Sequence, residues 1–163
     1  MKNILKRLCI VVGGVIILIN FSGCFSKSAS ITPPKGMSPI ETVQFYFEQW
    51  NDKNTNGMDS VVCDEKKSID YGKSHLIYVK LTKSIKETEK HMSLEGIYFS
   101  DTFPDYIEYS IVEVEFEIEY KKSWFFDNAG GFSDGKSIVD NWRYILGKTD
   151  ENSDWIIISW GAC

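Results

Sequence analysis

The sequence predicts an α+β domain in which an N-terminal helix packs on a curved, mainly antiparallel sheet. Two patterns carry this prediction. Near residue 40, apolar residues recur three and four positions apart, which is typical of a helix with one buried face. Over residues 106–121, apolar and charged residues alternate, which indicates a long strand with one buried and one wet face. The helix comes first and the strands follow it, so the strands can form a meander that the helix covers.

The predicted helix begins after Ser38. This serine can cap the helix, Pro39 suits its first turn, and Glu41 completes a capping box. The helix is expected to run to about Asn51, because an Asp-Lys-Asn stretch follows. Its apolar face carries Ile40, Val43, Phe47 and Trp50.

A weakly patterned helical turn is expected at about residues 58–63, followed by a loop over 64–74. Residues 76–88 fit strand alternation for most of their length and are interpreted as a strand, although the end of this run also fits a helix. Residues 106–121 form the clearest strand, and residues 127–136 read as a loop. Two further strands, 138–147 and 155–160, are separated by a short polar turn, so an antiparallel hairpin is expected.

The first 23 residues predict an export signal. Three positive residues precede an apolar run at residues 8–19, and small residues then precede Cys24. A run of this length is short of the roughly 20 apolar residues that span a bilayer. Residues 21–24 resemble the lipobox of bacterial lipoproteins, although Phe21 stands where such motifs usually carry Leu. The resemblance implies a lipidated Cys24, anchored to the cell membrane on its extracytoplasmic face.

The alternative interpretation of the leader is an uncleaved membrane helix over residues 8–25, and both interpretations put the rest of the chain outside the cytoplasm. If the leader is removed, residues 24–37 form a flexible tether, rich in Ser, Lys, Thr and Pro, and residues 38–163 form one domain. Loss of the three positive charges of the leader changes the net charge from −5 to −8. An acidic chain without a basic stripe repels phosphates, so no nucleic acid partner is expected.

The remaining cysteines are Cys63 and Cys163, once Cys9 is assigned to the signal and Cys24 to the lipid. Two exported thiols can form a disulfide. Such a bridge would close a loop of about 100 residues and contribute up to about 4–5 kcal/mol. The alternative is two unpaired thiols.

Three stretches resemble a known group of domains: VQFYFEQWN at residues 43–51, WRYILGK at 142–148 and WIIISWG at 155–161. They resemble the DUF4829 group of small exported bacterial domains, which is similar to the NTF2-like (cystatin-like α+β) superfamily. The resemblance covers residues 39–161 and implies a cone, in which helices line a concave sheet. Superfamily members include binding modules and a few small-molecule enzymes, so the fold does not select a function.

The cone suggests a pocket wall, although the same aromatic residues also suit a core. An enzyme on such a fold can act through a buried carboxylate or tyrosine. The carboxylates nearest the predicted strand ends are Asp101, Asp105 and Asp140. The candidate wall residues are Tyr46, Trp50, Phe116, Tyr120, Trp142 and Tyr144.

No metal site and no cofactor are expected. The oxygen-rich stretches 127–134 and 150–154 lack the spacing of a calcium loop, and His75 and His91 lack zinc-type spacing. No nucleophile elbow, phosphate loop or dinucleotide motif is present. The glutamates at 113, 115, 117 and 119 share one strand face, which is either a solvated surface or a surface for a cation or basic partner.

The sequence therefore supports two functions of different classes. The first is a non-enzymatic, membrane-anchored extracytoplasmic lipoprotein domain that binds a protein partner or a small apolar ligand. The second is a small-molecule enzyme that uses a buried carboxylate or tyrosine in the cone pocket. A structural component of the cell envelope is indistinguishable from the first at this level.

Overall fold

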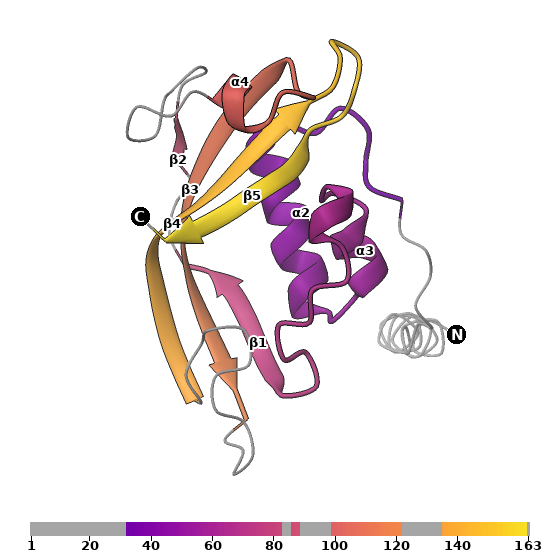
Figure 1. Ribbon diagram of the computed structural model, residues 1–163. Coiled ribbons are helices and arrows are strands. Elements are labelled where there is room, and N and C mark those ends of the chain that lie inside the picture. Colours follow the sequence, from indigo (N-terminus) through magenta and orange to yellow (C-terminus); the bar gives the residue numbers. More distant parts are fainter. Residues whose placement is uncertain (1–31, 83–85, 89–98, 122–134, 163) are drawn as a thin grey trace, which may run out of the picture.

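The computed structural model describes residues 32–82, 86–88, 99–121 and 135–162, and its architecture is α+β (Figure 1). Two helices lie on one side of an antiparallel sheet, and a short third helix lies near one end of it. The elements are α2 (Pro39–Asn51), α3 (Thr55–Asp59), the 3₁₀ turn η2 (Asp64–Lys66), β1 (Leu76–Leu81), β2 (Lys86–Thr88), α4 (Phe99–Thr102), β3 (Glu108–Tyr120), β4 (Gly135–Lys148) and β5 (Ile156–Ala162).

The sheet is open and has the strand order β1-β3-β4-β5. The long strand β3 lies in the middle. On one edge it pairs with β1 through residues 116–120 and with β2 through residues 111–113, so these two short strands follow each other along the same edge. On its other edge it pairs with β4 along most of its length, and β5 extends the sheet beyond the second half of β4. The predicted strand at 76–88 is thus two described strands, and the predicted hairpin of β4 and β5 is confirmed.

Helix α2 begins where the sequence predicts, because its capping box is complete. The Ser38 hydroxyl oxygen accepts from the Glu41 amide at 3.3 Å, and the Glu41 carboxylate accepts from the Ser38 amide at 2.7 Å. These two bonds satisfy donors that the first helical turn would otherwise leave unpaired. The bonded Glu41 carboxylate is stabilised in its charged form, so its pKa is lowered, mainly by the Ser38 backbone.

We expect Ser38→Ala to lower the free energy of unfolding by about 1 kcal/mol, since it removes the helix cap. The lowered pKa of Glu41 means that its contribution to stability is present above the ordinary pKa of a glutamate and is lost as the pH falls through the lowered value. Urea unfolding of wild type and Glu41→Gln at pH 7 and pH 3 tests this. Glutamine keeps an acceptor oxygen but does not titrate, so wild type should lose more stability than Glu41→Gln between pH 7 and pH 3. An equal loss in the two proteins would contradict the lowered pKa of Glu41.

The short helix after α2 differs from its predicted position. The sequence suggested a turn at about residues 58–63, but α3 is capped by Asn54, which accepts from the Gly57 amide at 3.2 Å. The chain beyond it is extended instead. Ile157 donates to the Val61 carbonyl at 2.8 Å and Cys63 donates to the Ile157 carbonyl at 3.0 Å. Pairing with β5 therefore takes the backbone groups that a helix at 58–63 would have used.

Two apolar clusters occupy opposite faces of the sheet. The larger lies between α2 and the sheet face that carries Val112, Val114 and Phe116. The smaller cluster lies on the other face at the end covered by α4, where Phe99 packs with Tyr109 and other residues of the sheet. Side chains alternate between the two faces along a strand, so β3 contributes to both clusters.

Strand β4 contains a bulge near its middle. Val114 of β3 faces Trp142, but Phe116, two residues later, faces Val139, three residues earlier in β4. Strand β4 therefore uses one residue more than β3 at this point. Asn141 lies in this extra stretch and has a φ of 52°, a conformation that asparagine adopts more readily than most residues.

Candidate functional site

The six aromatic residues proposed as a pocket wall come together between α2 and the sheet. Phe116 is fully buried, with ring centroids 6.0 Å from Trp50 and 6.2 Å from Trp142, and the Tyr46 ring lies 5.8 Å from that of Tyr144. Tyr120 is buried as well, and Trp142 is half-buried. These side chains pack on one another and on Phe47 as the main core of the domain. None of them lines the two surface depressions described below.

The buried tyrosines stay protonated near neutral pH. Burial raises the pKa of Tyr71 to about 12 and raises the pKa values of Tyr46, Tyr120 and Tyr144 further. Tyr120 donates its hydroxyl hydrogen to the Tyr71 carbonyl at 2.7 Å, which is a structural bond. A phenol in this state is no base. The carboxylates considered for the enzyme hypothesis, Asp101, Asp105 and Asp140, are exposed on the surface rather than buried beside these rings.

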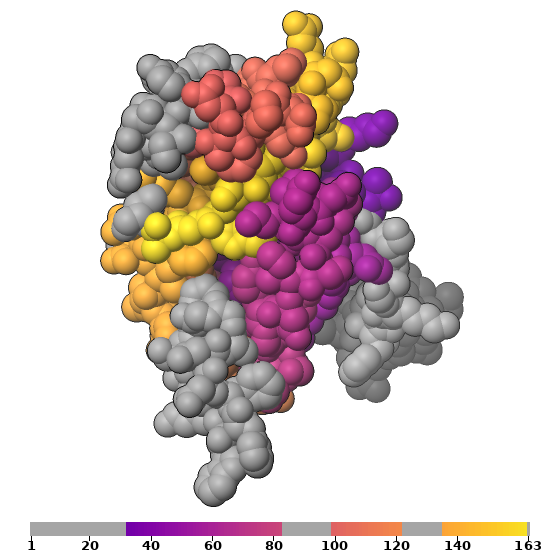
Figure 2. Space-filling view, viewed as in Figure 1, coloured from indigo at the N-terminus to yellow at the C-terminus, as the bar shows by residue number. Residues whose placement is uncertain are grey.

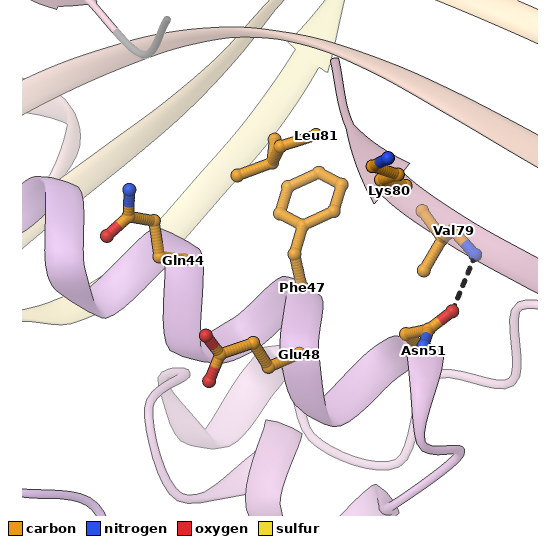
Figure 3. A pocket seen from close by; sticks show the side chains of 7 residues that line it. All are labelled: Gln44, Phe47, Glu48, Asn51, Val79, Lys80 and Leu81. Carbon is orange, nitrogen blue, oxygen red and sulfur yellow. Dashed lines mark hydrogen bonds between the residues drawn. The ribbon is translucent and has the colours of Figure 1, made fainter. Parts of the chain in front are cut away.

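A groove of about 400 Å³ runs between α2 and β1 (Figure 3). Its floor is apolar: Phe47 points from the helix toward Leu81 of the strand, and Val79 lies beside them. The exposed side chains of Gln44 and Glu48 form the rim on the helix side. The lining residues are Gln44, Phe47, Glu48, Asn51, Val79, Lys80 and Leu81.

The groove borders an open edge of the sheet, because β1 pairs with β3 alone among the described residues. The Thr82 amide donates to Glu115 of β3 at 3.1 Å. Inward and outward backbone groups alternate along an antiparallel strand, so the amide and carbonyl of Leu81 and Val79 point away from β3. The Val79 amide donates to the Asn51 side chain at 3.1 Å, as Figure 3 shows. Asn51 therefore occupies the outward amide of Val79, and no described residue bonds to the outward amide or carbonyl of Leu81.

The helix side of this groove carries one carboxylate, that of Glu48. Helix α2 contains no lysine or arginine, its exposed side also carries Glu41 and Gln44, and Asp52 and Lys53 follow its last residue. Two of these carboxylates, Glu48 and Asp52, take no part in the capping box. The opposite edge of the sheet differs, since residues 61–63 pair with the start of β5. Among the described residues, the β1 edge thus combines free backbone groups, an apolar floor and a charged rim.

A second depression, of about 280 Å³, lies where α4, the segment after α3 and β5 meet (Figure 2). Cys63 lines it but is only 8% exposed, and its thiol makes a weak bond to the Ile158 carbonyl at 3.7 Å. Burial raises the pKa of the Cys63 thiol, and Glu65 adds to the effect. The nucleophile in thiol chemistry is the thiolate, so Cys63 is not activated for catalysis. Among the described residues, Cys63 forms no disulfide. Cys163 lies outside the described residues, so their bridge stays a prediction.

We expect the Cys63 thiol to react slowly with an aromatic disulfide reagent in the native protein, at least about a hundredfold more slowly than in denaturant, because labelling requires local opening. The measurement is labelling of the Cys163→Ser variant with and without urea. Rapid native labelling would contradict the buried, protonated thiol. In the wild-type chain, a Cys63 that stays unreactive in urea until a reductant is added would show the bridge to Cys163.

Two glutamates of β3 are paired with cations of the neighbouring strand β4. Glu117 accepts from Lys136 of β4 at 2.7 Å and from the Tyr78 hydroxyl of β1, and these bonds lower the pKa of its carboxyl, Lys136 most. Glu113 lies 3.4 Å from the Arg143 side chain. Opposite charges across strands favour this pairing. The acidic face is therefore partly neutralised within the sheet, which weakens its interpretation as a surface for a basic partner.

The described residues bring no three His, Cys, Asp or Glu side chains together in a metal-binding group. Residues 150–154 form a turn in which the Asp150 carboxylate accepts from the Asn152 amide at 2.8 Å. His75 is half-exposed, and its ring nitrogen lies 2.8 Å from the Ser74 hydroxyl. His91 and the oxygen-rich stretch 127–134 lie outside the described residues.

The leader and Cys24 also lie outside the described residues, whereas the end of the expected tether is described. Gly36 donates to Asp154 at 2.8 Å and Met37 packs against the core, so the tether joins the domain before Ser38. Within the described part of the chain, every helix is too short or too polar to cross a membrane.

Sequence reasoning missed the groove. Its rim residues Gln44 and Glu48 fall on the exposed side of a correctly predicted helix, but nothing local in the sequence says that β1 lies at a sheet edge beside them. The signal that was available is the lack of any basic residue in α2. Comparisons with family models, curated proteins and solved structures found no match to this chain.

Proposed function

We propose that this chain is a membrane-anchored extracytoplasmic lipoprotein whose NTF2-like domain binds a protein partner in the groove between α2 and β1. The proposal assigns no catalytic role to the domain. The observation that carries it is the groove itself, which joins an apolar floor at Phe47 and Leu81 to backbone groups of a sheet edge that no described residue pairs with. Such a surface suits a polypeptide better than a small apolar ligand, because a polypeptide can pair with the backbone.

The anchoring part of the proposal rests on the leader pattern and on Cys24 after a lipobox-like stretch. The NTF2-like part rests on the order of one capped helix followed by an antiparallel meander, which agrees with that superfamily at the level of α+β architecture. The binding part gains support from the packed aromatic core. Trp50, Phe116 and Tyr144 are almost fully buried, which favours a binding site on the surface over one in the interior.

Anchoring can be tested on the full chain expressed with its own leader in a bacterium. We expect the protein to sediment with membranes, to resist extraction by high salt, and to yield an N-terminal peptide in which Cys24 carries the mass of the attached lipid. Cys24→Ala should lose the lipid. Recovery of mature protein with an unmodified Cys24 would contradict the anchoring.

Binding can be tested with a photo-reactive residue in intact cells. Placed at Gln44 on the rim of the groove, it should crosslink a protein partner, whereas the same residue at Glu151 in the turn between β4 and β5 should not. Both positions are exposed, so they sample the surroundings equally. Crosslinking at Glu151 alone, or at neither position, would contradict binding at the groove.

A further inference from the structure

We propose that the partner binds by strand addition, with an extended cationic segment pairing with the free edge of β1 at Leu81. This inference rests on the proposed binding function and adds to it the mode of binding and the chemistry of the partner. It is carried by three observations: the outward backbone groups of β1, the apolar floor of the groove, and the acidic rim of α2.

The backbone of β1 limits where a strand can add. An incoming antiparallel strand forms its bonds in pairs, with the outward amide and carbonyl of every second residue. The Val79 amide is already used by Asn51 at 3.1 Å, so the groups that no described residue occupies are the Val79 carbonyl and both backbone groups of Leu81. The contact is therefore short and centred on Leu81. A short contact of this kind suits a weak, reversible complex.

The side chains of the incoming strand meet two different surroundings. On the groove face, a side chain opposite Leu81 lies over the apolar floor that Phe47 provides, and its neighbours on that face approach Glu48. Lys80 is exposed and alternates with buried Val79, so its side chain lies on the other face of the strand although the residue also lines the groove. The edge thus favours a segment with an apolar residue flanked by cations on one face and neutral residues on the other.

A second copy of this chain fits the edge less well. Pairing two β1 edges would bring two α2 rims together, and each rim carries the carboxylate of Glu48 without a basic residue on its helix. Like charges brought together at an interface disfavour association. A cationic partner instead gains from the same rim. Charge is therefore the reason for proposing a basic segment of another protein, and not a second copy of this chain, as the occupant of the edge.

The test uses the full chain in detergent micelles and the synthetic peptide acetyl-Thr-Lys-Thr-Val-Thr-Lys-Thr-amide. Amide hydrogen exchange, resolved by residue, is measured with and without the peptide. At a peptide concentration ten times its Kd, exchange of the Leu81 amide should slow by about tenfold, while exchange of the Val79 amide, already bonded to Asn51, should not change. The matched peptide with Glu in place of Lys should give no protection at the same concentration.

Two variants test separately how much the backbone amide of Leu81 and the charge of Glu48 contribute to peptide binding. Leu81→Pro removes the outward amide but no bond to β3, and it should weaken peptide binding by at least about fivefold, whereas Leu81→Val keeps the amide and should bind normally. Glu48→Lys lies on the exposed helix surface, where it leaves the strand intact, and it should weaken the cationic peptide by at least about threefold. Glu151→Lys makes the same charge change in a distant turn and should have no effect.

Several outcomes would overturn strand addition. The Leu81 amide could remain unprotected by the cationic peptide, or Glu48→Lys could bind both peptides as wild type does. Protection of Leu81 that rises with protein concentration, without peptide, would identify a second copy as the occupant. The wider proposal fails separately: crosslinking at Gln44 in cells together with an unprotected Leu81 would keep a partner in the groove and remove only the strand mode.

Discussion

Phe116→Ala is expected to lower the free energy of unfolding by about 3–5 kcal/mol, the range for truncating a large buried aromatic residue. Phe116 is fully buried in the middle strand, and its ring lies 5.0 Å from that of Phe47 and 6.0 Å from that of Trp50. Removing it leaves a cavity between α2 and β3 that rigid neighbouring rings cannot fill. A loss of this size is a large part of the total stability of a small domain. Urea unfolding followed by tryptophan fluorescence measures it.

The matched control is Ile138→Ala in the neighbouring strand. Ile138 pairs with Glu117, next to Phe116, but its side chain is 70% exposed. A surface substitution of this kind should change the free energy of unfolding by less than about 0.5 kcal/mol. If Phe116→Ala also cost less than about 1 kcal/mol, the aromatic set would line open space rather than form the core, and the enzyme hypothesis would return.

Gly147→Ala is the substitution with the second largest expected effect. Gly147 lies in β4, and a Cβ atom there would come within 2.6 Å of Tyr106 Cδ1 and 2.7 Å of its Cγ. These are atoms at the base of the tyrosine ring, which cannot swing away as the tip of a flexible side chain could. Tyr106 packs against the cluster under α4, so we expect a cost of about 1–3 kcal/mol from overpacking.

Gly161→Ala provides the control, because a Cβ atom at this position in β5 would meet nothing within 4 Å. It should leave stability nearly unchanged. A double-mutant cycle with Tyr106→Ala then isolates the clash. If the clash is real, Gly147→Ala should cost much less in the Tyr106→Ala background than in wild type. Equal costs in both backgrounds would show that loss of glycine, and not contact with the ring, destabilises the strand.

The elements that the sequence predicts best are those with a local physical cause. Ser38 and Glu41 bond to each other across one turn, so α2 could be located to the residue. The alternation in β3 from Val112 to Tyr120 likewise follows from one buried face. The short helix α3 was misplaced because the competing interaction, pairing of Val61 and Cys63 with Ile157, involves a residue almost a hundred positions away.

The candidate site depends on long-range order even more strongly. Tyr46 and Tyr144 look the same in the sequence whether they line a pocket or fill a core, and only their near-complete burial in the structure places them in the core. The groove combines residues of α2 with an edge strand, and edge position depends on strand order. Strand order is a property of the whole sheet, so Leu81 could not be identified as a site residue from its neighbours in the chain.

Because of the bulge in β4, we expect this strand to tolerate the loss of one residue. Val139 and Trp142 both contribute to the core side although they are three positions apart, and a regular strand would place them on opposite faces. A chain shortened by one residue between them would regain strict alternation, and Tyr144 and Leu146 would still face α2. Removal of Asn141 would therefore keep every apolar side chain on its present face. What it would remove is the local bend that the extra residue gives to the strand.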